Sequence, residues 1–218
     1  MTNKDVADDQ VLLPPSLANS RYERAMMALG CFWSPDARFG SMPAVVQTTV
    51  GYAGGDSPTP RYTALGGHIE TLQLHFDPQL ISYTELLDIF FTVHNPMRSP
   101  IKRQYASALF PIDAAQESAA REALGHNGQR LGGQPSTLIL PGARFYPAEA
   151  YHQKFHLQQH RPLLQELESH FGSYAEALFS TEAARMNGWV SGFRDTAEIQ
   201  AEMERLSFPR SLQEAMLD

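Results

Sequence analysis

Short apolar runs that are typical of strands alternate with helix-start signals between residues 24 and 160. Ser82 and Glu85, for example, form a capping-box pattern that predicts the start of a helix. The alternation does not follow a strict βαβ rhythm, so we expect an α/β fold, an α+β two-layer sandwich around a mixed β-sheet with packed helices. The predicted strands are 24–29, 45–50, 68–76, 105–110 and 136–140, the predicted helices are 34–41, 82–93, 113–124 and 148–171, and a loop is predicted at 51–60.

The two ends of the chain differ in character from this middle region. Residues 1–20 are rich in acidic residues and contain Pro14-Pro15, which predicts a flexible N-terminal arm. Residues 161–218 lack strand signals, and glutamate, alanine and leucine dominate there. The pair Asn187-Gly188 predicts a helix stop within this tail. We therefore expect a catalytic domain at 21–160 and a helical extension at 161–218 that packs on it.

Composition excludes several classes of partner. The formal net charge is −7 and the pI is about 5.6, so the surface should repel phosphate backbones, and no nucleic-acid partner is expected. No apolar run approaches the roughly 20 residues that span a bilayer, so no membrane partner is expected. The N-terminus has neither the basic start nor the apolar core of a signal peptide, which predicts a cytoplasmic protein.

Cys31 is the only cysteine in 218 residues, and it follows a predicted strand in the sequence Gly30-Cys31-Phe32-Trp33. Such a thiol is either a small buried hydrophobe or a reactive group, and the residue types alone favour neither. Unpaired backbone N–H groups at a helix start would stabilise its thiolate. A single cysteine forms no internal disulfide, so any oxidised form of Cys31 must be reset by an outside thiol.

A series of motifs follows Cys31 in a characteristic order. The motifs are Gly51-Tyr52-Ala53-Gly54-Gly55, Pro60-Arg61-Tyr62, Gly67-His68-Ile69-Glu70, Asp77-Pro78, His94-Asn95-Pro96, Gln104-Tyr105-Ala106-Ser107-Ala108 and Phe145-Tyr146-Pro147-Ala148-Glu149, the last running into His152-Gln153. The ordered set resembles the A-type peptide methionine sulfoxide reductases over about residues 24–160. The resemblance implies reduction of the S-epimer of methionine sulfoxide, free or in peptides, as a repair of oxidised protein under oxidative stress.

The resemblance also implies roles for six residues. Methionine leaves, and the cysteine becomes a sulfenic acid that thioredoxin, glutaredoxin or a small thiol reduces, without a metal or another cofactor. The implied roles are the nucleophile for Cys31, the acid that protonates the sulfoxide oxygen for Glu70, hydrogen bonds to that oxygen for Tyr62 and Tyr105, and contacts with the substrate's ε-methyl group for Phe32 and Trp33.

These residue types suit that chemistry. A sulfoxide oxygen leaves only after it gains a proton, so a positioned acid is needed. A carboxyl near a thiolate and against aromatic rings has a raised pKa, and we therefore expect Glu70 to be largely neutral. The hydroxyls of Tyr62 and Tyr105 donate hydrogen bonds without carrying charge. The alternative for Glu70 is the solvated face of a strand, and the alternative for the tyrosines is plain packing.

Three features depart from the family pattern. The stretch 98–103 is short and lacks the family's aspartate, a role for which Lys102 or Arg103 could substitute. Ala106 stands where an arginine usually follows the tyrosine, and the loop from Tyr62 to Glu70 is shortened. Many relatives also carry C-terminal resolving cysteines, which this chain lacks.

Other interpretations remain open at this point. One is a thiol peroxidase-like enzyme, and another is a catalytically impaired relative that binds methionine-containing peptides or senses oxidants through Cys31. His152, His156 and His160 recur every four residues on a predicted helix, a spacing that can bind zinc. No cysteine or carboxylate motif completes such a site, so we predict no metal. Trp189 would either close the tail over the pocket or anchor the tail.

Overall fold

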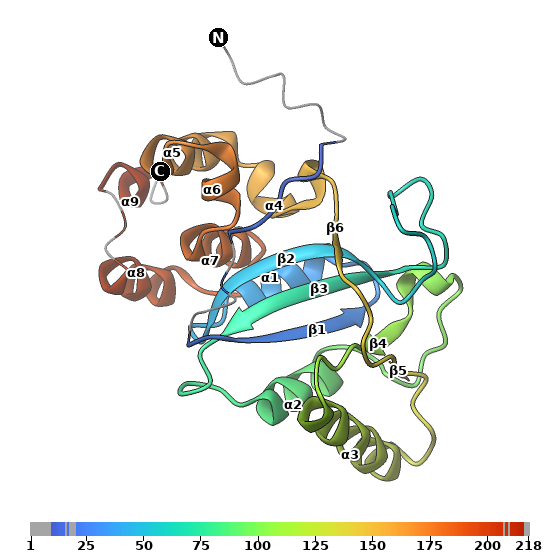
Figure 1. The fold of residues 1–218 in the computed structure, drawn as a ribbon. Coiled ribbons are helices and arrows are strands. Elements are labelled where there is room, and N and C mark those ends of the chain that lie inside the picture. The colour runs from blue at the N-terminus through green and yellow to red at the C-terminus, as the bar shows by residue number, and fades with distance from the viewer. Residues whose placement is uncertain (1–9, 16, 18–20, 207, 209, 216–218) are drawn as a thin grey trace.

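The computed structural model describes residues 10–15, 17, 21–206, 208 and 210–215. The described residues contain a six-stranded sheet in the order β5-β4-β1-β3-β2-β6 (Figure 1). All neighbouring strands are antiparallel except β4 and β5, which are parallel, so the sheet is mixed and the predicted α/β fold is confirmed. The strands are β1 (Glu23–Leu29), β2 (Val45–Ala53), β3 (Ile69–Phe76), β4 (Ser107–Leu109), β5 (Leu138–Ile139) and β6 (Tyr146–Pro147).

Most predicted helices form where their start signals lie. Ser82 and Glu85 make the predicted capping box, and the Asp113 side chain accepts a hydrogen bond from the backbone N–H of Gln116. No helix among the described residues is long and apolar enough to cross a membrane. The helices are α1 (Trp33–Gly40), α2 (Tyr83–Val93), α3 (Ala114–Leu131), α4 (Phe155–Gln158), α5 (Arg161–Phe171), α6 (Tyr174–Leu178), α7 (Thr181–Val190), α8 (Thr196–Arg205) and α9 (Arg210–Ala215), with 3₁₀ turns at Arg103–Tyr105 and Ala150–His152.

The sheet buries both of its faces because successive side chains on a strand point to opposite sides. Ala25 and Met27 of β1 belong to the main core, which also takes apolar side chains from α1, α2 and α3. Met26 and Ala28 belong to a smaller core on the other face, together with Phe110. Since both faces of β1 are covered, its apolar run is continuous rather than alternating.

One end of the sheet gathers the functional candidates. The pairing of Leu29 with Ser107 and of Met27 with Leu72 brings together the end of β1 and the starts of β3 and β4. Gly30 turns the chain from β1 toward α1 with φ of +94°, a left-handed conformation that favours glycine. Cys31 therefore leaves the sheet at the end where β3 begins.

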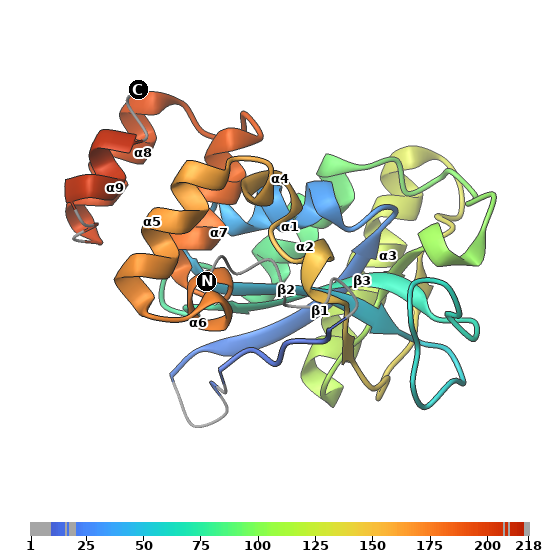
Figure 2. The same cartoon turned by 90° about the horizontal axis from the view of Figure 1, so that it is seen from above.

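The helices after residue 160 form a separate group at one end of the sheet, away from α3 (Figures 1 and 2). They share their own apolar cluster, against which Trp189 packs, so Trp189 anchors the tail. The predicted helix stop at Asn187-Gly188 is wrong, because both residues lie inside α7. Gly188 instead permits close packing on α1: a Cβ there would lie 2.4 Å from the Cβ of Ser41 and 2.8 Å from the carbonyl oxygen of Ala37.

The predicted continuous helix at 148–171 is also wrong. Lys154 has φ of +49°, and this left-handed residue separates the turn at Ala150–His152 from α4. The predicted loop at 51–60 likewise begins too early, because β2 continues to Ala53. The predicted arm falls largely on residues 1–9, 16 and 18–20, which lie outside the described residues; Val11 forms a β-bridge with Glu149.

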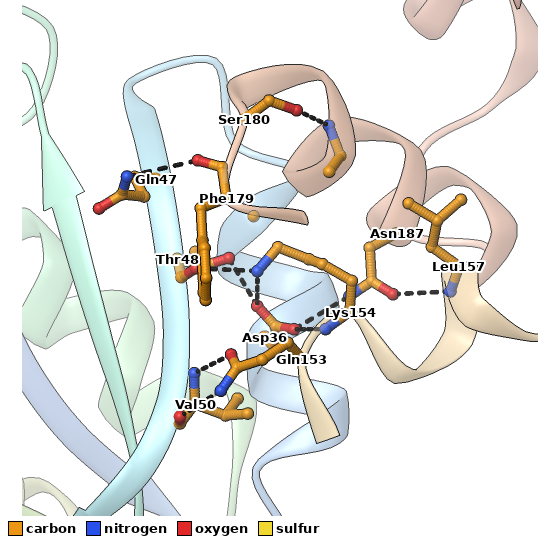
Figure 3. A network of polar contacts seen from close by, with 12 residues as sticks. Asp36, Gln47, Thr48, Val50, Gln153, Lys154, Leu157, Phe179, Ser180 and Asn187 are labelled. Atoms are coloured by element: carbon orange, nitrogen blue, oxygen red, sulfur yellow. Dashed lines mark hydrogen bonds and ion pairs between the residues drawn. The ribbon is translucent and has the colours of Figure 1, made fainter. Parts of the chain in front are cut away.

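A buried polar network joins α1 to the segments that follow it (Figure 3). Lys154 and Asp36 are fully buried and form an ion pair with Nζ 3.2 Å from Oδ1. The Lys154 ammonium also donates to the carbonyl oxygen of Thr48 at 2.8 Å. The backbone N–H of Lys154 donates to the Asp36 carboxylate at 3.1 Å. From α7, the Asn187 side chain donates to Asp36 and accepts from the backbone N–H of Leu157. The network fixes α1, β2, α4 and α7 relative to one another.

Candidate active site

The Cys31 thiol lies between β1 and α1, and the residue is exposed to solvent. Partial desolvation by the surrounding protein raises the pKa of the thiol. The backbone N–H of Trp33 bonds to the sulfur and lowers this pKa, while the charge of Glu70 raises it. The helix-start contact that we expected is therefore present, but desolvation outweighs it, and the resting group is the thiol rather than the thiolate.

The Glu70 carboxyl is buried directly behind the backbone of the residue that follows Cys31. Its side chain is only 1% exposed, so the alternative of a solvated strand face is wrong. Oε2 accepts from the backbone N–H of Phe32 at 3.1 Å, and Oε1 accepts from Gln104 Nε2 at 2.6 Å. Burial outweighs these two hydrogen bonds and raises the pKa of Glu70, in the direction that the sequence predicts.

The hydroxyls of Tyr62 and Tyr105 meet beside these two groups. Their hydrogen bond, with smaller contributions from desolvation and from the charges of Glu70 and Cys31, raises the pKa of Tyr105 to about 12. Arg103 holds the loop that carries Tyr62, because its guanidinium donates to the carbonyl oxygens of Gly67 at 2.8 Å and Gly54 at 3.0 Å. The structure thus brings both predicted tyrosines together at Cys31.

The two aromatic residues after Cys31 lie in different surroundings. Phe32 is 1% exposed and belongs to the main core. Trp33 is partly buried, stacks on Phe155 with ring centroids 3.7 Å apart, and donates its indole N–H to His152 Nδ1 at 3.2 Å. Of this predicted pair, Trp33 is therefore the ring with more surface open to a ligand.

Sequence reasoning missed a second buried carboxyl at the site. Although burial raises the pKa of Glu149, hydrogen bonds from the Tyr52 hydroxyl and the backbone N–H of Tyr62 outweigh it and lower the pKa. The two carboxyls thus have opposite tendencies, with Glu70 favoured as the neutral acid and Glu149 as the carboxylate. Glu149 ends the motif Phe145-Tyr146-Pro147-Ala148-Glu149, which entered the sequence analysis only through the resemblance. Its position just before Tyr151 and His152 was the available signal for a buried carboxyl.

The three histidines with four-residue spacing do not form a helix face. Lys154 breaks the helix between His152 and His156, and His160 precedes the start of α5. Within the described ranges, no group of three or more potential metal ligands converges. His152 packs instead against Phe32, with ring centroids 5.0 Å apart, and burial lowers its pKa to about 4.

A mixed α/β sheet that ends in an accessible thiol beside a buried carboxyl is typical of a cysteine-dependent enzyme. A family model described as peptide methionine sulfoxide reductase matches residues 23–182. A peptide methionine sulfoxide reductase of Drosophila melanogaster is 38% identical over 186 residues, which cover 84% of this chain and 74% of the relative. The chain therefore belongs to the peptide methionine sulfoxide reductase family, and it is an oxidoreductase that reduces methionine sulfoxide.

Solved structures show the same similarity. Methionine sulfoxide reductase A of Corynebacterium diphtheriae matches with a TM-score of 0.60 and 28% identity, covering 67% of this chain and 79% of that one. Reduced Mxr1 from Saccharomyces cerevisiae matches with a TM-score of 0.61 and 26% identity, covering 69% and 91%. The family match extends past residue 160, where we placed the boundary of the catalytic domain.

Proposed function

We propose that the enzyme reduces the S-epimer of methionine sulfoxide, with Cys31 as the nucleophile and Glu70 as the acid. The observation that carries these roles is the hydrogen bond from Phe32 to Glu70, which fixes a carboxyl of raised pKa next to the nucleophile. The Cys31 thiol gives up its proton and its sulfur attacks the sulfoxide sulfur, while the proton of Glu70 moves to the oxygen. The hydroxyl group then moves from the substrate sulfur to the Cys31 sulfur as the sulfur–sulfur bond breaks, so methionine leaves and Cys31 becomes a sulfenic acid. The proton released by the thiol restores Glu70.

Tyr62 and Tyr105 stabilise the oxygen as charge develops on it. Their mutual hydrogen bond sets the position of both hydroxyls before substrate binds, and neutral donors cost little reorganisation in the reaction. Trp33, held between Phe155 and His152, offers an apolar surface to the substrate's methyl group, and Phe32 supports it from the core.

Arg103 and Gln104 supply polar support in the segment where the family's aspartate is absent. Gln104 orients the Glu70 carboxyl, and Arg103 ties the Tyr62 loop to the Tyr105 turn. These contacts argue against the alternative that the protein is a catalytically impaired relative, because they hold the acid and both tyrosines in place.

An outside thiol closes the cycle. The sulfenic acid takes one thiol to form a mixed disulfide and water, and a second thiol then releases Cys31 and leaves as a disulfide. Cys31 is the only cysteine in the sequence and is exposed, so thioredoxin, glutaredoxin or a small thiol can reach it. The cytoplasmic location stays a prediction from the sequence.

The test is a peptide that contains both epimers of methionine sulfoxide, incubated with dithiothreitol and separated by chromatography. We expect one epimer to disappear, methionine to form in equal amount, and both changes to be absent in Cys31→Ser. Loss of both epimers would contradict the stereochemical proposal. Consumption of peroxide without methionine formation would instead support the thiol peroxidase-like alternative.

A further inference from the structure

A cavity of about 310 Å³ opens next to the active site, because Gly30 and Tyr105 are among the residues that line it. Leu29, Pro100 and Ile101 give it an apolar lining. None of the residues that line the cavity is acidic. The mechanism proposed above uses Tyr105, at the edge of this space, and leaves the cavity itself without a role.

The wall of the cavity is held in place by hydrogen bonds. The backbone N–H of Ser136 donates to the carbonyl oxygen of Pro96 at 2.7 Å, and its hydroxyl lies 2.8 Å from the carbonyl oxygen of Arg98. His94 is fixed at both ring nitrogens, with Nδ1 2.6 Å from the Phe90 carbonyl oxygen and Nε2 2.9 Å from Ser107 Oγ. Burial lowers the pKa of His94, so its imidazole adds no positive charge to the wall at pH 7.

The rim combines apolar and cationic side chains that are exposed to solvent. Ile101 is 93% exposed, although it is a large aliphatic residue beside a cavity. Arg98 and Lys102 are also exposed, and no described residue forms an ion pair with either of them. Arg103 differs, because the carbonyl oxygens of Gly54 and Gly67 engage its guanidinium. In a chain of net charge −7, this is a local positive surface next to the nucleophile.

We propose that this cavity and its rim, the 94–105 cleft, bind the peptide around the methionine sulfoxide and favour substrates with acidic neighbours. An apolar side chain of the peptide fills the cavity against Ile101, and an aspartate or glutamate pairs with Arg98 and Lys102. Two arguments fix this occupant. The cleft is continuous with the site through Gly30 and Tyr105, and its charge is complementary to an acidic peptide. The inference rests on the proposed function and adds a substrate class to it.

The test compares three peptides, acetyl-Asp-Leu-Met(O)-Asp-amide and its counterparts with glutamine or lysine in place of aspartate. Each exposed ion pair contributes modestly, so with two such pairs wild type should use the aspartate peptide about two- to thirtyfold better in kcat/KM than the lysine peptide. This ratio should fall toward one at high salt because screening weakens exposed charge pairs. In Arg98→Glu/Lys102→Glu the ratio should invert.

A matched variant reverses two exposed charges elsewhere. Arg24 lies at the start of β1, at the opposite end of that strand from Cys31, and Arg121 lies on α3. Arg24→Glu/Arg121→Glu should keep the wild-type ratio, which separates the cleft from net charge. An unchanged ratio in Arg98→Glu/Lys102→Glu would overturn the inference.

Binding measured without turnover separates the cleft from the chemistry. Fluorescently labelled versions of the aspartate and lysine peptides are titrated with Cys31→Ser, and their anisotropy gives the two values of Kd. Tighter binding of the aspartate peptide, lost in the Arg98→Glu/Lys102→Glu background, supports the cleft. Equal Kd values overturn it. Failure of wild type to reduce N-acetyl-methionine sulfoxide would count against the proposed function alone.

Discussion

Glu70 accepts the backbone N–H of Phe32 at 3.1 Å, so the buried carboxyl is tied to the peptide unit that follows the nucleophile. A shift of the loop that carries Cys31 would therefore stretch this hydrogen bond. Gln104 holds the other oxygen at 2.6 Å, and each oxygen keeps a further lone pair for a proton. These two hydrogen bonds thus fix the position of the acid relative to the nucleophile.

Glu70→Gln should change reduction and alkylation in opposite directions. Loss of the acid should slow turnover by about 10²- to 10⁴-fold. When Glu70 is ionised, its charge raises the pKa of Cys31, so removal of the carboxyl should lower that pKa and speed alkylation by iodoacetamide at alkaline pH, where the carboxyl has lost its proton. Because Cys31 is the only cysteine, intact mass reports alkylation directly.

Glu149→Gln is the matched control for this prediction. It removes the other buried carboxyl of the site, whose charge is not among the causes that raise the pKa of Cys31. Alkylation in this variant should stay near the wild-type rate. Slower alkylation of Glu70→Gln than of wild type would show that the two groups are not coupled as described.

Local patterns predicted most of the strands and the helix starts near the site, but they failed where distant residues decide the backbone. The capping box at Ser82 needs only Glu85, three residues away. Lys154, by contrast, breaks a helix-prone run because its ammonium and backbone N–H reach Asp36, 118 positions earlier. No periodicity within 148–171 contains that information.

The same distinction applies to the site. The motif order pointed to the thiol, the acid and the tyrosines, and the structure brings these groups together. The role of Gln104 was not predicted, and Arg103 was named only as one of two substitutes for the family's aspartate, because each acts on a segment at least 34 positions away. Gly188 looked like a helix stop, although its small size serves contact with α1.

His152 should make stability depend on pH. Burial lowers its pKa to about 4 in the folded protein, whereas an unfolded histidine titrates near 6.5. Between these two pH values the unfolded state binds a proton that the folded state does not. The contribution of neutral His152 to the free energy of unfolding is therefore fully present above about pH 6.5 and is lost as pH falls toward 4. Lowering pH from 7 to 5 should cost about 1–2 kcal/mol through this residue.

Urea unfolding at pH 7 and pH 5 checks this expectation. His152→Gln, which keeps an acceptor for the Trp33 indole, should lose less stability between these pH values than wild type does. His126→Gln removes an exposed histidine of α3 and serves as the control. An equal pH dependence in His152→Gln and wild type would exclude His152 as the titrating group.

The buried ion pair between Lys154 and Asp36 should be costly to break from one side. Lys154→Met leaves the Asp36 carboxylate buried without its cation, and the free energy of unfolding should fall by about 3–5 kcal/mol. Lys154→Met/Asp36→Asn removes both charges and should recover part of this loss. Chemical denaturation measures all three proteins, and a double variant less stable than Lys154→Met would contradict a charge-based cause.

Gly188→Ala should destabilise the contact between α7 and α1. The added methyl group would lie 2.4 Å from the Cβ of Ser41, and the required shift should cost about 1–3 kcal/mol. Gly125→Ala in α3 is the control, because no atom lies within 4 Å of its added Cβ and alanine favours a helix by up to about 1 kcal/mol. Thermal unfolding of both variants should therefore shift in opposite directions.

The contact between α7 and α1 also affects when the enzyme can mature during synthesis. By the time residue 180 is made, the ribosome has added all six residues assigned to the reaction, yet Asn187 and the buried guanidinium of Arg185, which bonds to Gly40 and Val45, are still to come. The nascent chain therefore contains all the reactive residues before α1, the helix that follows the nucleophile, has all the residues that it contacts in the folded protein. Synthesis of α7, rather than synthesis of the reactive residues, completes the catalyst.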